Sequence, residues 1–63
     1  MAIKIHFFEG EDLYEVNLDT MEIKIMDRDR KGAPMGFVHC IPTGTGRYEA
    51  ALKRAKTIKA ERG

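Results

Sequence analysis

Residues 3–25 read IKIHFFEGEDLYEVNLDTMEIKI and carry the strongest structural signal in this sequence of 63 residues. Apolar and polar residues alternate in three runs, and this period of two places successive side chains on opposite faces of a β-strand. Glycine and acidic residues at 9–12, and then Asp19 with Thr20, interrupt the alternation and are typical of turns. The stretch therefore predicts three antiparallel strands joined as a meander.

The segment that follows this meander predicts a loop and one further strand. Residues 27–34 are highly charged and end in glycine and proline, which favours an exposed loop. Residues 36–41 are apolar enough for a short fourth strand. Pro42 ends that strand because proline has no N–H to donate to the ladder.

The apolar period changes to that of a helix after the glycine-rich residues 43–46, and a helix is predicted over about 46–61. The predicted fold class is α+β, a three- or four-stranded antiparallel sheet over 2–41 with one C-terminal helix packed on one face. A chain of this length has room for one core, so residues 1–63 are expected to form a single domain. The predicted core consists of Ile3, Ile5, Phe7, Tyr14, Val16, Leu18, Ile23 and Ile25 from the strands and Tyr48, Ala51, Leu52, Ala55 and Ile58 from the helix.

Composition favours a folded protein of the cytoplasm. The chain is 43% hydrophobic and 33% charged, which is too apolar for intrinsic disorder. Its single cysteine, Cys40, excludes an intramolecular disulfide and fits a reducing compartment. No apolar run is long enough to span a membrane, and the first residues lack the pattern of a signal peptide.

The residues that commonly carry catalysis are too few or wrongly spaced for an active site. The sequence has no serine, and His39 and Cys40 are neighbours on a predicted strand, where adjacent side chains point to opposite faces. With His6 the only other histidine, too few ligands exist for a structural zinc ion. We expect a binding protein, not an enzyme, without a metal or another cofactor.

Charge is segregated along the chain. Residues 1–42 carry five basic against eight acidic residues, a net charge of −3, whereas residues 43–63 carry six against two, a net charge of +4. An acidic hairpin surface attracts a protein with a basic surface and repels nucleic acid. The alternative is that these residues keep turns and an edge strand soluble. The predicted acidic binding set is Glu11, Asp12, Glu15, Asp19 and Glu22.

The basic helix offers an alternative binding set for nucleic acid. Several cations in a short segment could neutralise phosphates. At 100° per residue, however, they do not form one stripe, which favours an ordinary solvated helix face. The alternative basic set is Arg47, Lys53, Arg54 and Lys56.

Residues 41–51 read IPTGTGRYEAA and resemble the C-terminal segment of a family of small phage-encoded anti-CRISPR proteins. That family has Leu-Pro, a glycine-rich turn and then Gly-Arg-x-Glu-x-Ala at the start of a terminal helix. The resemblance covers about a fifth of the chain. The matching positions, with one turn residue deleted here, are Pro42, Gly44, Gly46, Arg47, Glu49 and Ala51.

The resemblance implies an antiparallel sheet with C-terminal helical structure. It also implies an inhibitor that binds a subunit of a type I CRISPR surveillance complex in the bacterial cytoplasm, so that target DNA cannot pair with the guide. The contact residues of that family lie outside the matched segment, so none is carried over to this sequence. This chain is also shorter and lacks the helix that precedes the turn in that family.

Two other functions stay open. A three-stranded sheet followed by one helix also looks like the DNA-binding domains of plant ethylene-response factors and some integrase arms. Those domains carry arginine and aromatic rows on the exposed sheet face, whereas the corresponding face is acidic here. The chain could also be a homodimeric phage accessory protein that uses Phe8, Leu13 and Met26 as a contact patch.

Overall fold

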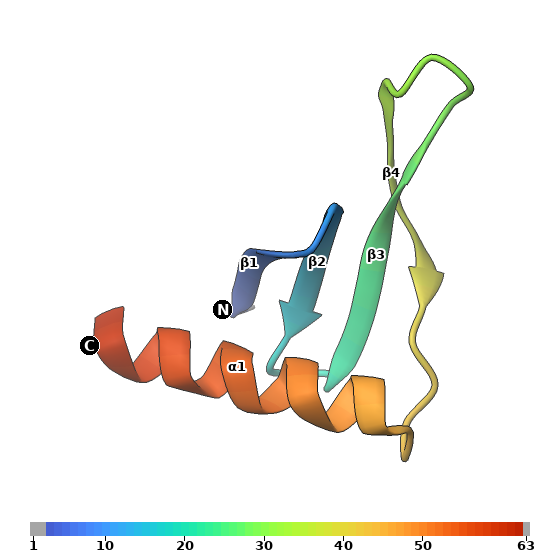
Figure 1. Cartoon of the computed structure of the whole chain (residues 1–63). Coiled ribbons are helices and arrows are strands. Elements are labelled where there is room, and N and C mark those ends of the chain that lie inside the picture. Colours follow the sequence, from blue (N-terminus) through green and yellow to red (C-terminus); the bar gives the residue numbers. More distant parts are fainter. Residues whose placement is uncertain (1–2, 63) are drawn as a thin grey trace.

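The computed structural model describes residues 3–62, which form a four-stranded antiparallel sheet and a helix (Figure 1). The strands are β1 (Lys4–Glu9), β2 (Asp12–Asn17), β3 (Glu22–Arg28) and β4 (Pro34–Cys40), and the helix α1 spans Gly46–Arg62. Strands adjacent in sequence are adjacent in the sheet, in the order β1-β2-β3-β4. The predicted α+β meander with a C-terminal helix is confirmed in its four-stranded form.

The hairpin between β3 and β4 has a shorter loop than the sequence predicts. β3 ends at Arg28, and β4 begins at Pro34, two residues earlier than the predicted fourth strand. The turn is tight because the Asp29 carboxylate accepts backbone hydrogen bonds from Lys31 (2.9 Å) and Ala33 (2.8 Å). Proline is tolerated at Pro34 because it opens an edge strand, where no ladder partner is needed on one side.

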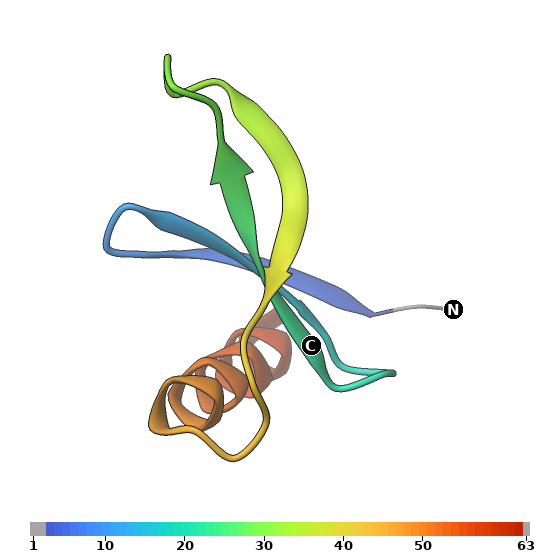
Figure 2. The ribbon, with the colours of Figure 1, turned by 90° about the vertical axis from the view of Figure 1, so that its right-hand side faces the viewer.

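The core lies between α1 and one face of the sheet (Figure 2). Every predicted core residue is buried or partly buried, because the strand and helix periods place them all on facing surfaces. Ile41 was not predicted to belong to the core, yet it is buried, with only 7% of its surface exposed. Its N–H donates to the carbonyl of Ile23 (2.9 Å), so the chain stays against the sheet beyond the end of β4. The buried residues are Ile5, Phe7, Tyr14, Val16, Ile23, Ile41, Tyr48, Ala51, Leu52 and Ala55.

The glycine-rich connection fixes the start of α1 at one end of the sheet. Thr45 caps the helix, since its Oγ1 accepts the N–H of Tyr48 (3.2 Å) and donates to the carbonyl of Pro42 (2.8 Å). Tyr48 Oη donates to the carbonyl of Met21 (2.6 Å) in the turn between β2 and β3. Gly44 has a φ of 88°, a conformation that favours glycine. The segment that carries the family resemblance thus serves the fold.

One face of the sheet has no helix on it (Figure 2). Helix α1 packs on β1, β2 and β3, while the β3–β4 hairpin projects beyond the helix-covered body (Figures 1 and 2). Two register shifts between β3 and β4, at Ile25/Met26 and Asp27/Arg28, accompany the strong twist of this hairpin. In the part of the chain that the structure describes, no helix is long and apolar enough to cross a membrane.

Candidate functional site

The predicted acidic set is spread over both ends of the sheet. Glu11 and Asp12 lie at the turn between β1 and β2, whereas Asp19 and Glu22 lie at the opposite end of β2. A strand of this length spans about 17 Å at a rise of ~3.3 Å per residue. The five carboxylates therefore do not form a single patch. They are close in sequence, but the length of β2 separates them in space.

Three members of the acidic set have partners within the chain: Asp12, Glu15 and Asp19. Glu15 Oε2 lies 3.1 Å from Nε2 of His6, its cross-strand neighbour, and the Glu15 side chain is only 16% exposed. Asp19 Oδ2 accepts the N–H of Ile3 (2.8 Å). This hydrogen bond holds Ile3, which precedes β1, against the turn between β2 and β3. Glu15 lies on the sheet face turned away from α1, but its side chain is largely covered by its neighbours.

Arg47 ties the start of α1 to β2. Its Nη2 lies 3.2 Å from Oδ2 of Asp12, and its Nε donates to Tyr14 Oη (2.6 Å). The guanidinium carbon also lies 5.5 Å from the centre of the Tyr14 ring. The hydrogen bond with Tyr14 raises the pKa of Arg47 above its ordinary value. The Arg47 side chain is thus held by contacts within the protein itself.

Arg54 makes a similar contact with β1. Its Nη1 donates to Glu9 Oε2 (2.7 Å), and its guanidinium carbon lies 4.9 Å from the centre of the Phe7 ring. Arg54 follows Arg47 after two helical turns, so both arginines lie on the same side of α1. The opposite charges of the helix and the hairpin therefore meet each other within one molecule.

Other members of the two charged sets have no such partner. Among residues 3–62, no hydrogen bond or ion pair engages the side chains of Glu11 or Glu22. The same holds for the ammonium groups of Lys53 and Lys56 on α1. The predicted basic set is thereby divided into two arginines that face the sheet and two lysines that do not.

An apolar patch lies on the sheet face that α1 leaves uncovered. Phe8 of β1 is directly opposite Leu13 of β2, and Met26 of β3 is opposite Phe37 of β4. Leu13 and Met26 each lie one residue beyond Tyr14 and Ile25, the last residues paired across β2 and β3, so both side chains are on the outer face. We call these four residues the outer patch: Phe8, Leu13, Met26 and Phe37.

The sheet face that carries the outer patch is curled rather than flat. The rings of His6 and Phe37 are 5.4 Å apart, although they come from the two edge strands of the sheet. Twist has therefore curled the face until side chains from β1 and β4 touch. Leu13, Met26 and Phe37 are partly buried by this curling, whereas Phe8 is 60% exposed. An exposed aromatic ring thus lies at the rim of a partly covered apolar surface.

The residues considered for metal binding or catalysis remain apart. Within residues 3–62, no three His, Cys, Asp or Glu side chains are grouped closely enough to hold a metal ion. Cys40 is exposed, and His39 Nε2 lies 3.4 Å from Asp27 Oδ1 on the neighbouring strand. The expectation that the protein is not an enzyme stays a prediction.

Sequence reasoning named three residues of the outer patch but missed Phe37 and the role of His6. The alternation of β1 and β2 is enough to pair Phe8 with Leu13. The contact with Phe37 depends on the register shifts in β3 and β4, and no sequence signal marks them. No protein-family model matches the chain, and no curated protein or solved structure shows significant similarity to it.

Proposed function

We propose that this chain is a small protein-binding domain that contacts its partner through the outer patch. The observation that carries the proposal is the uncovered sheet face, on which four apolar side chains lie in two cross-strand pairs with Phe8 exposed. Apolar side chains gathered on an uncovered face are typical of contact sites between proteins. An aromatic side chain at such a site commonly dominates the binding energy, and Phe8 is the most exposed of the four.

The partner that suits this face is a protein with apolar side chains next to basic ones. Glu11 follows β1 close to the outer patch, and its carboxylate has no ion pair among the described residues. Unpaired carboxylates around an apolar centre favour a cationic surface and raise the rate of encounter. We place the protein in the bacterial cytoplasm, where Cys40 stays reduced.

A narrower form of the proposal makes the partner a nucleic-acid-handling complex, and the chain an inhibitor of it. The resemblance of residues 41–51 to the anti-CRISPR family supports this form, together with the lysine-rich grooves that such complexes use to hold nucleic acid. The subunits of type I surveillance complexes are therefore the first partners to try.

Affinity capture with a matched pair of variants tests the proposal. The immobilised protein is exposed to nuclease-treated bacterial lysate and, separately, to a purified type I surveillance complex. Phe8→Lys places a charge in the outer patch and is expected to weaken capture about tenfold or more. Val38→Lys is the control, because Val38 is about as exposed (61%) as Phe8 but lies outside the outer patch.

Equal capture by both variants would contradict the proposal. A partner that disappears after nuclease treatment would instead indicate nucleic acid as the ligand. Light scattering on the isolated protein tests whether a second copy occupies the outer patch. That occupant is indicated if the mass doubles as the concentration rises and if Phe8→Lys keeps the mass of a monomer.

A further inference from the structure

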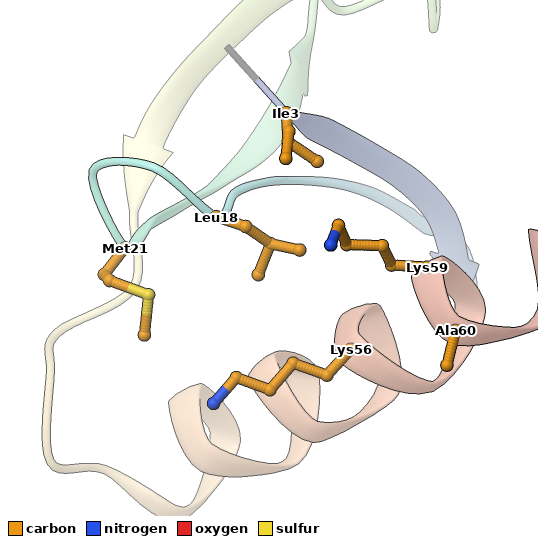
Figure 3. A pocket seen from close by; sticks show the side chains of 6 residues that line it. All are labelled: Ile3, Leu18, Met21, Lys56, Lys59 and Ala60. Atoms are coloured by element: carbon orange, nitrogen blue, oxygen red, sulfur yellow. The ribbon is translucent and has the colours of Figure 1, made fainter. Parts of the chain in front are cut away.

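A second surface lies on the helix-covered side of the molecule. It is a shallow groove of about 420 Å³ between the C-terminal half of α1, Ile3 just before β1, and the turn between β2 and β3 (Figure 3). Its floor is apolar, whereas its α1 side carries two lysines. We call it the helix groove, and its lining consists of Ile3, Leu18, Met21, Lys56, Lys59 and Ala60.

Both lysines of the helix groove are free to meet a ligand. Figure 3 shows the side chain of Lys59 extending from α1 toward Leu18, whereas the side chain of Lys56 runs along α1 at the edge of the groove. No hydrogen bond or ion pair engages either ammonium group within residues 3–62. The carboxylate of Asp19, in the adjoining turn, is already held by the N–H of Ile3. Two unpaired cations above an apolar floor suit a ligand that is both apolar and negatively charged.

The backbone conformation of Met21 is a second feature of the helix groove that does not depend on the lysines. Its φ is 64°, a left-handed conformation that costs a residue such as methionine about 1 kcal/mol or more. The backbone is locked there, since the N–H of Met21 donates to the carbonyl of Asn17 (2.8 Å) and its carbonyl accepts Tyr48 Oη (2.6 Å). Glycine would form the same turn without the strain.

Core packing does not account for methionine at this position. The residue is 39% exposed and lies at the wall of the helix groove. Methionine is unbranched and polarizable, so it adapts to the shape of a bound apolar group. A strained backbone that keeps an adaptable, exposed side chain beside two unpaired lysines points to a role in binding.

We propose that the helix groove binds an acidic peptide segment of a protein partner. One large apolar side chain of the segment packs on Ile3, Leu18 and Met21, while flanking carboxylates pair with Lys56 and Lys59. Sites for free small molecules enclose most of the ligand, whereas this groove is open to solvent and suits a side chain presented by a longer chain. The groove is separate from the outer patch, so this proposal does not depend on the function proposed above.

Titration of the isotope-labelled protein with three short peptides, followed by NMR, tests the proposal. The probe is acetyl-Glu-Asp-Leu-Phe-Asp-Glu-amide, and its controls carry lysine in place of the acids or serine in place of Leu-Phe. Only the probe is expected to give saturable shifts at Leu18, Met21 and Ala60, with a Kd on the order of 1 mM or below. Saturable binding of either control, or shifts that map elsewhere, would overturn the proposal.

Three variants separate the groove from general electrostatics. Lys56→Gln with Lys59→Gln is expected to raise the Kd about fivefold or more, whereas Lys31→Gln with Lys53→Gln, which also removes two positive charges but outside the groove, leaves it unchanged. Met21→Gly is expected to raise the Kd about tenfold while the melting temperature stays the same or rises, because the backbone strain is relieved. Unaltered binding in Met21→Gly, or equal losses in the lysine variants and their control, would contradict the proposal. Stronger shifts of the same residues by anionic phosphatidylglycerol vesicles would assign the groove to lipid and overturn it as well.

Discussion

Arg47 shows how one side chain joins the two halves of this molecule. Its contacts with Asp12 and Tyr14 hold the first turn of α1 against β2. From the sequence alone it was a candidate for contact with phosphate, because it belongs to a short helical segment that carries several cations. The residue that receives it could not be inferred without knowing how the helix lies on the hairpin.

Replacing Arg47 should therefore weaken the fold rather than remove a binding site. Arg47→Ala is expected to lower the free energy of unfolding by about 1 kcal/mol, the usual net value of a hydrogen bond, since the ion pair is exposed and adds little. Arg47→Lys should restore only part of this, because lysine lacks the planar fork that contacts both groups at once. Chemical denaturation measures both, with Lys53→Ala as the control. A loss in Lys53→Ala as large as that in Arg47→Ala would contradict this role.

The elements themselves follow from the sequence, but their ends do not. Alternation over residues 3–25 and the helical period after Gly46 are strong enough to predict the strands and the helix with nearly all of the core. The start of β4 and the burial of Ile41 were missed, because a proline and a charged run resemble a loop. Tertiary contact with β3 overrides that local preference. The register shifts that complete the outer patch have no local signal at all.

Packing of α1 on the sheet is testable at Leu52. This side chain is 9% exposed within the core, so Leu52→Ala is expected to cost about 2–5 kcal/mol. A domain of this size has little more stability than that, and thermal melting should show a largely unfolded protein. Ile58→Ala, at a partly buried position further along the helix, should melt clearly higher. A melting temperature of Leu52→Ala close to that of the parent protein would contradict the packing of α1 described above.

At the scale of the whole molecule, charge segregation turned out to have an internal role. The sequence places an acidic hairpin before a basic helix, which suggests an external partner of opposite charge for one or the other. In the structure, Glu9 and Asp12 pair with Arg54 and Arg47 across the interface between hairpin and helix. The acidic hairpin and the basic helix of this small domain therefore pair with each other. The apolar side chains that remain on the uncovered face are then the stronger indication of a partner.

The methyl groups of the methionines provide the most direct test of the outer patch as the contact surface. Met26 lies in the outer patch, Met21 lines the helix groove, and Met35 lies on the projecting β4. With ¹³C-methyl methionine labelling, addition of the unlabelled captured partner is expected to shift or broaden the Met26 signal and leave those of Met21 and Met35 in place. An unchanged Met26 signal, with a response at Met21 or Met35 instead, would contradict the account.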